Sequence, residues 1–147
     1  MKHLLFTMLL ATTVAFAQDG AAKKGPSSKA HVLTKSEIDD LLTKPDQVLI
    51  VDVRRPDEIK EIGGFPVYLN VQIAELERSL PWIPKDRTII AVSNHAARAG
   101  RAADILAKNG FNVAGAAGAE TYEQEGGKLT KIVAPPPNNN AKKASVQ

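Results

Sequence analysis

Two short apolar runs constrain the fold of this chain more than any other feature of its sequence. Residues 49–53 (LIVDV) and 88–92 (TIIAV) are almost uninterrupted and rich in β-branched side chains. Runs of this kind are typical of strands that are buried on both faces of a parallel sheet. A third and weaker run, residues 111–114 (FNVA), predicts another strand. The chain must therefore supply helices that cover two faces of one sheet.

Helical patterns lie between these runs. Thr34 and Glu37 have capping-box spacing and open a helix that places Ile38, Leu41 and Leu42 on one side. Apolar residues within 71–80 predict a short helix that ends at Pro81, and residues 97–108 predict a longer one that stops at Asn109-Gly110. A last short helix is expected within 120–127, closed by glycines. Alternating strands and helices predict an α/β fold with a mainly parallel central sheet and helices on both faces.

The two ends of the chain differ from its middle. Residues 1–17 have a basic start, an apolar stretch over 4–16 and an Ala-Phe-Ala cleavage site, which predicts a secretory signal peptide. An uncleaved anchor is the alternative, but the stretch is shorter than the about 20 residues that span a bilayer. We expect a flexible lead-in over 18–30, one domain over 31–130 and a disordered Pro/Asn-rich tail over 131–147. The protein is then periplasmic or secreted, and it does not span a membrane after cleavage.

Composition excludes several classes of function. The chain has no cysteine, and both of its methionines, Met1 and Met8, lie in the expected signal peptide. Disulfides, cysteine nucleophiles and thiolate metal sites are therefore excluded. Residues 31–130 hold 12 basic and 15 acidic side chains, so the basic charge belongs to the two ends and nucleic-acid binding has no support. His31 and His95 are too far apart in sequence for metal-ligand spacing, and we expect neither a metal nor a cofactor.

The candidate site follows the second apolar run, where a strand leads through a short loop into a helix. Ligands of open α/β sheets bind beyond the carboxyl ends of the strands. The free amides and the positive dipole end of a helix N-terminus attract anions there, and Arg98 adds a guanidinium that suits a sulfate, a phosphate or a carboxylate. The predicted anion-binding residues are Ser93, Asn94, His95, Ala96, Ala97 and Arg98. The alternative is that Ser93 or Asn94 caps the helix and that Arg98 pairs with a neighbouring acid.

The motifs around this loop resemble those of the rhodanese-like domain family. LIVDVR at 49–54 with PDE at 56–58 resembles the opening of that domain, and GFP at 64–66 with LNV at 69–71 resembles its next turn and strand. Ser93–Arg98 matches the six-residue active-site loop, and Tyr122 stands where the family usually has tryptophan. The resemblance covers about residues 31–130 and implies the rhodanese fold.

The same resemblance exposes a departure at the reactive position. In rhodanese-like sulfurtransferases the first loop residue is a cysteine that carries a persulfide, and here that residue is Ser93. Because a hydroxyl cannot hold transferable sulfur, the ordinary sulfur-transfer reaction is excluded. The usual central glycine of the loop is Ala96 in this chain. Phosphatase relatives also need a cysteine, in a loop that is one residue longer.

Three functional hypotheses follow. The preferred one is an exported, monomeric, non-catalytic domain that binds a small oxyanion or an acidic group of a partner protein with the loop. The second is an enzyme of unknown reaction that uses Ser93 and His95 in the same pocket, although two residues so close in a tight loop are expected to point apart. The third is a vestigial pocket on a protein that works through its outer surface.

Overall fold

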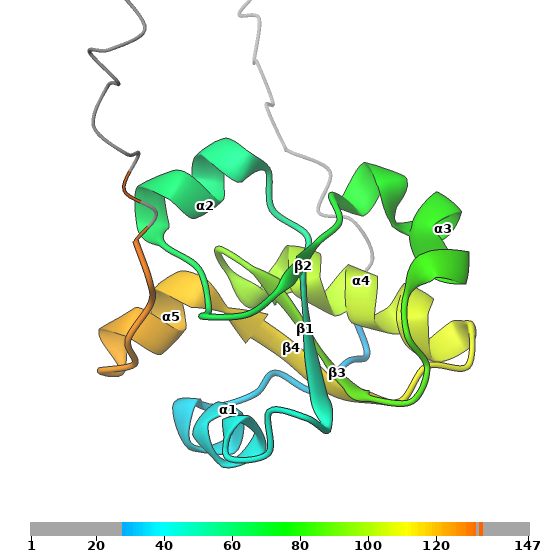
Figure 1. Ribbon diagram of the computed structural model, residues 1–147, viewed down its shortest axis with the longest axis horizontal. Helices are drawn as coiled ribbons and strands as arrows, with labels where there is room; N and C mark the ends of the chain where they lie inside the picture. The colour runs from blue at the N-terminus through cyan, green and yellow to red at the C-terminus, as the bar shows by residue number, and fades with distance from the viewer. Residues whose placement is uncertain (1–27, 132, 134–147) are drawn as a thin grey trace, which may run out of the picture.

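A four-stranded, all-parallel sheet in the order β2-β1-β3-β4 forms the centre of the molecule. The structure is a computed structural model, and it describes residues 28–131 and 133. The predicted signal peptide, most of the lead-in and nearly all of the tail lie outside the described residues. In chain order the elements are α1 (Lys35–Leu42), β1 (Val48–Asp52), α2 (Pro56–Ile62), β2 (Leu69–Asn70), η1 (Ile73–Glu75), α3 (Leu76–Ser79), η2 (Leu80–Trp82), β3 (Thr88–Ser93), α4 (Ala96–Lys108), β4 (Val113–Gly118) and α5 (Ala119–Gln124) (Figure 1).

The two predicted central strands are adjacent in the sheet and fully in register, from Val48↔Thr88 to Asp52↔Val92. Their side chains alternate between two apolar clusters, as residues of a strand buried on both faces must. Ile89 and Ala91 pack with α3 and α4, whereas Ile90 and Val92 pack with α1 and α5. The predicted α/β fold with helices on both faces of a parallel sheet is confirmed.

The helix boundaries follow local sequence signals. The predicted capping box of α1 is present, because the Thr34 side chain accepts from the Glu37 amide and the Glu37 carboxylate accepts from the Thr34 amide. Helix α4 ends at the predicted stop, where Gly110 has a φ of 79°. The helix α2 was not predicted, although Pro56 at its first position and two acidic residues in its first turn are ordinary start signals.

Two predicted elements differ from the structure. The expected strand at 111–114 lies further along, at Val113–Gly118, because its alanines and glycines fit against α4 despite their low strand propensity. The expected helix within 71–80 is divided into η1, α3 and η2, and its final 3-10 turn includes Pro81. Proline at the second position of a helical turn loses no hydrogen bond, so the helical turn continues through Pro81.

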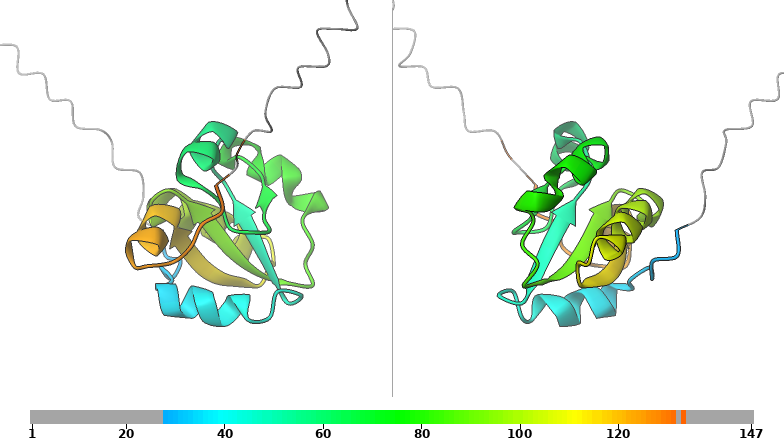
Figure 2. Two further views of the ribbon diagram at one scale, coloured as in Figure 1. Left: turned by 60° about the vertical axis from the view of Figure 1, so that its left-hand side comes forward. Right: turned by 90° about the vertical axis from the view of Figure 1, so that its right-hand side faces the viewer.

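The edges of the sheet are covered unequally. Val32 forms a parallel bridge with Ala116 of β4, and Lys29 donates its amide to Asp104 of α4, so the segment before α1 lies against this edge. At the other edge, β2 pairs with β1 over two residues. In both views of Figure 2, α1 lies at the end of the sheet where the strands begin, and α2 lies at the end where they finish.

No helix among the described residues is long and apolar enough to cross a membrane.

Candidate functional site

The predicted six-residue loop is mostly built into regular structure. Ser93 is the last residue of β3, α4 begins at Ala96, and only Asn94 and His95 link them. His95 occupies the N-cap position in an extended conformation, and its side chain makes no capping hydrogen bond. No residue other than glycine has a positive φ in the described part of the chain, so Ala96 replaces a glycine without strain. The link is a short turn and not a wide loop.

Ser93 is fully buried, and its hydroxyl group is committed to the protein. The Ser93 Oγ donates to the His95 carbonyl at 2.5 Å and accepts from the Ala99 amide at 2.9 Å. Both hydrogen bonds tie the end of β3 to the first turn of α4. Ser93 therefore holds the first turn of α4 from a position before its N-cap, and its hydroxyl is not presented to solvent.

Arg98 also has the alternative partner that the sequence left open. Its guanidinium forms a bidentate pair with the Glu58 carboxylate of α2, with Nη2–Oε1 at 2.6 Å and Nη1–Oε2 at 2.9 Å. The hydrogen bonds from Arg98 hold the pKa of Glu58 at about 2, despite the burial that would raise it. The Glu58 side chain is 13% exposed and that of Arg98 is 26% exposed, so the pair is partly screened from water. The charge of Arg98 is thus neutralised within the protein.

A second ion pair is connected to the first one through the Asn94 side chain. The Asp52 and Arg54 side chains are both fully buried, and the Arg54 Nη2 lies 2.7 Å from the Asp52 Oδ2. The Arg54 Nη1 also donates to the Asn94 Oδ1 at 3.3 Å, and the Asn94 Nδ2 donates to the Glu58 Oε1 at 3.0 Å. These contacts form one continuous polar chain from the end of β1 to α4. We call the four side chains around the turn (Glu58, Asn94, Arg98 and Arg54) the loop clamp.

The two arginines after β1 point in different directions. Arg54 turns inward to the loop clamp, and Arg55 pairs with Asp57 on the surface. The Arg55 amide also donates to the Glu58 carboxylate at 2.9 Å. Glu58 therefore caps α2 while it holds α4, which gives this residue two structural roles.

The arrangement of Ser93 and His95 does not form a nucleophile and a base. The Ser93 hydroxyl contacts the His95 carbonyl oxygen and not its ring. The His95 side chain is 77% exposed, and its Nδ1 lies 3.6 Å from the Glu120 Oε2. A serine nucleophile needs a base within hydrogen-bond reach of its hydroxyl. The structure gives the enzyme hypothesis no support.

The backbone amides of the turn, unlike its side chains, remain suited to bind an anion. Within residues 28–131 and 133, no hydrogen bond uses the amides of residues 94–98 as donors. These amides stand at the positive end of the 13-residue helix α4. Gly118 lies directly beneath them, and a Cβ placed there would come within 3.2 Å of the Ala96 amide nitrogen. The turn thus depends on a close approach that glycine permits.

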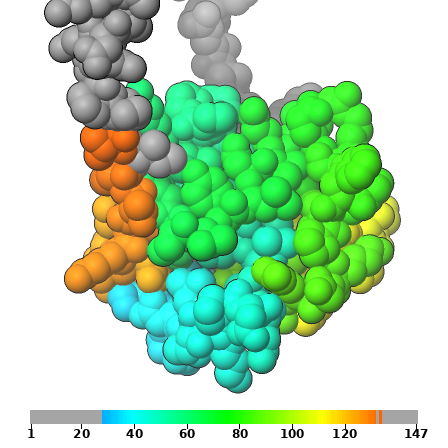
Figure 3. Space-filling model, viewed as in Figure 1, coloured from blue at the N-terminus to red at the C-terminus, as the bar shows by residue number. Residues whose placement is uncertain are grey.

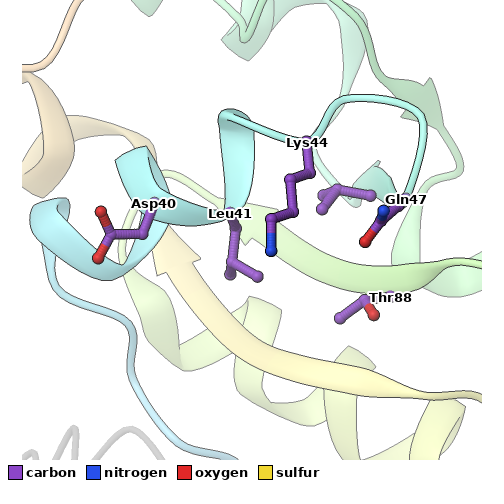
Figure 4. Close-up of a pocket in the computed structure, with 6 residues that line it drawn as sticks. Asp40, Leu41, Lys44, Gln47 and Thr88 are labelled. Atoms are coloured by element: carbon purple, nitrogen blue, oxygen red, sulfur yellow. The ribbon is translucent and has the colours of Figure 1, made fainter.

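Two hollows lie at the opposite end of the sheet, near α1. One has a volume of about 300 Å³ and is bordered by Asp40, Lys44, Gln47 and Thr88, together with two apolar residues; Figure 4 shows these polar side chains spread along its rim. The other is about 230 Å³ and mainly apolar. Among the described residues no group of three histidine, cysteine or acidic side chains is placed to hold a metal ion.

This chain matches a known family model and resembles several solved structures. A family model described as "Rhodanese-like domain" matches residues 34–127. A rhodanese-related protein from Thermoplasma volcanium is similar, with a TM-score of 0.59 and 22% identity over 69% of this chain and 99% of that one. A rhodanese-like domain protein from Staphylococcus aureus has a TM-score of 0.57 and 22% identity, over 68% of this chain and 98% of that one.

A further similar structure carries a different description. It is a protein of unknown function from Rhodopseudomonas palustris, described as a possible tyrosine phosphatase, with a TM-score of 0.58 and 22% identity over 68% of this chain and 84% of that one. At such identities the likeness shows the fold alone. No curated protein matches the chain.

Proposed function

The chain belongs to the rhodanese-like domain family, and we propose that it serves as an exported, non-catalytic domain that binds an anionic group at the start of α4. The observation that carries the proposal is the set of unpartnered amides at residues 94–98, among the residues that the structure describes. The ligand is a small oxyanion or an acidic group of a partner protein. The domain has no cysteine, so it is not a rhodanese of the ordinary kind.

Binding at this turn would depend on the backbone more than on a free charge. Because Arg98 is paired with Glu58, it can offer an incoming anion only the part of its charge that the carboxylate leaves uncompensated. The amides and the helix dipole supply the remaining attraction. We therefore expect weak binding of free anions. A partner protein that adds contacts around one acidic group would bind more tightly.

An NMR titration tests the proposal. The full-length ¹⁵N-labelled chain is titrated with sulfate, thiosulfate, phosphate and acetate at constant ionic strength, with chloride as the balancing anion. Saturable shifts of the amides of residues 94–98 are expected, with a preference among the four anions. If the chemical shifts of these amides do not change at millimolar anion, the proposal is refuted and the turn has a structural role only.

Two arginine variants test whether anion binding depends on Arg98. Arg98→Ala leaves Glu58 without its cation, so the turn becomes more negative and anion affinity is expected to fall by about 1–3 kcal/mol. Arg101→Ala removes an exposed arginine from the same helix, one turn further on, and serves as the matched control. Equal affinities for the parent and for Arg98→Ala would contradict the proposed site.

Export is tested separately. The predicted signal peptide would be removed after Ala17, so the mature chain would begin at Gln18. Expression of the full gene in a bacterium, followed by cell fractionation and mass spectrometry of the intact chain, reads out that start directly. Recovery of the chain in the cytoplasm with its first 17 residues still present would refute export.

A further inference from the structure

Strand β1 has an unpaired edge over half of its length. It pairs with β3 along all five residues, from Val48 to Asp52. On its other side, the two-residue strand β2 begins pairing only at Val51↔Leu69. Among the described residues, no strand lies beside residues 48–50 on that side. The sheet therefore has a gap of one short strand at this position.

The direction of the backbone groups follows from the hydrogen bonds on either side of β1. The Gln47 carbonyl and the Val53 amide bond to β3, so odd-numbered residues present their backbone groups to β3. The Asp52 carbonyl accepts from the Val71 amide on the β2 side, so even-numbered residues face the gap. Both backbone groups of Val48 and the amide of Ile50 thus point toward it, whereas the Ile50 carbonyl lies at the Val51↔Leu69 pairing with β2. For Val48, neither the amide nor the carbonyl has a partner among the described residues.

These groups open into the apolar hollow described above. It has a volume of about 230 Å³ and borders β1 itself. Its other lining residues come from the end of α1 and the turn after it, from the segment after α2 and from the residue before β3, and they are Leu42, Pro45, Pro66, Val67 and Arg87. Figure 3 looks onto the face where the cyan α1 region meets the green segment that follows α2. Val67 is 81% exposed, so one apolar side chain at the rim of the hollow is open to solvent.

Arg87 is the one charged residue that lines this hollow. No acidic side chain pairs with it among the residues that the structure describes. The hollow thus offers apolar walls, a guanidinium and a row of backbone hydrogen-bonding groups. An extended peptide carries complements to all three.

We propose that this groove binds an extended segment of a partner protein, which adds to β1 as a strand and places a carboxylate on Arg87. Backbone hydrogen bonds to the amide and carbonyl of Val48 and to the amide of Ile50 would supply affinity, as in other complexes formed by strand addition. Apolar side chains of the segment would fill the hollow. The groove lies at the opposite end of the sheet from the amides of residues 94–98, so this inference is independent of the anion site.

A second copy of the chain fits the groove less well. A symmetric pair would bring two identical grooves together, and none of the residues that line them is acidic. Arg87 would then face no carboxylate. The charge of the groove therefore favours an acidic segment of a different protein.

Synthetic peptides provide the test. The full-length ¹⁵N-labelled chain is titrated with blocked heptapeptides of alternating valine and threonine, in which one aspartate is moved through the threonine positions. We expect one of them to shift the amides of Val48 and Ile50 saturably and to slow their hydrogen exchange. Its asparagine counterpart should bind about two- to fivefold more weakly. Arg87→Gln should abolish that difference.

Two surface variants control for the apolar contact. Val67→Asp should weaken binding of the aspartate peptide several-fold, because it places a negative charge on the rim of the groove. Val32→Asp alters an exposed valine at the far edge of the sheet and should bind as the parent does. Shifts of Val48 and Ile50 that depend on protein concentration without peptide would replace the partner with a second copy. A series of peptides that moves neither amide would overturn the proposal.

Discussion

Substitution of Glu58 by glutamine tests the loop clamp most directly. The carboxylate accepts from the Arg98 guanidinium, the Asn94 amide group and the Arg55 backbone amide. The pKa of Glu58 falls from its ordinary 4.5 to about 2. Because one pKa unit corresponds to about 1.4 kcal/mol, the charged form gains about 3 kcal/mol on folding. Glutamine keeps the shape but loses the charge, so we expect Glu58→Gln to destabilise the domain by about 2–3 kcal/mol at pH 7.

The same shift fixes the sign of the pH dependence. A carboxylate whose pKa is lower in the folded chain stabilises it above about pH 4.5, and this stabilisation is lost as the pH falls toward 2. About 2 kcal/mol of the contribution should be gone by pH 3. The difference in unfolding free energy between the parent and Glu58→Gln should therefore narrow between pH 7 and pH 3. Other carboxylates with lowered pKa values, such as Glu37, are common to both proteins and cancel in the difference.

Urea denaturation followed by far-UV circular dichroism measures the effect. Tryptophan fluorescence is a poor reporter, because Trp82 is 84% exposed in the folded chain. Asp57→Asn is the control on the same helix, since the Asp57–Arg55 pair is on the surface and should contribute far less. A Glu58→Gln variant as stable as the parent at pH 7, or a difference that stays constant down to pH 3, would refute the role of the clamp.

Three further substitutions follow from the structure. Arg54→Ala leaves the fully buried Asp52 without its cation and should cost about 3–5 kcal/mol in unfolding free energy, measured by urea denaturation; a loss below 1 kcal/mol would contradict that account. Gly118→Ala should displace the turn, because the new Cβ comes within 3.2 Å of the Ala96 nitrogen. Amide chemical shifts of the variant and the parent measure this displacement, and differences confined to regions away from the turn would contradict the contact. Thr34→Ala removes the cap of α1 and should cost about 1 kcal/mol of thermal or urea stability, whereas an unchanged midpoint would show the cap to be dispensable.

The sequence predicts the centre of the fold well, because burial on two faces leaves a strong pattern. The strands β1 and β3 coincide with the two β-branched runs, and α1 and α4 begin and end near their capping signals. Strand β4 was placed too early for a physical reason. Its Gly115 must be small because a Cβ there would meet the His31 carbonyl at 2.5 Å, and that neighbour comes from a segment more than 80 residues away in the chain. Strand propensity carries no signal of such a contact.

The sequence likewise predicts some features of the candidate site and not others. Its position at the end of β3 and the start of α4 follows from the sequence, because the strand and helix patterns meet there. The partner of Arg98 does not, since Glu58 is 40 residues away and several other acids were available. The burial of the Ser93 hydroxyl was equally out of reach, because it depends on how α4 folds back over the strand. Local pattern therefore located the turn, and tertiary packing decided which of its groups remain accessible.

The order of the strands in the sheet has a consequence for how the chain acquires its structure. Strand β1 has its long partner in β3, which begins 40 residues later in sequence, and the intervening strand β2 pairs with it over two residues. Closing so large a loop costs entropy before any pairing energy is gained, and parallel sheets of this kind form slowly. A chain that emerges from its N-terminus during synthesis cannot pair β1 with β3 until residue 93 is free, and it completes the four-stranded sheet only when β4 follows. We therefore expect the first half of the domain to remain without its central strand pairing until its second half follows.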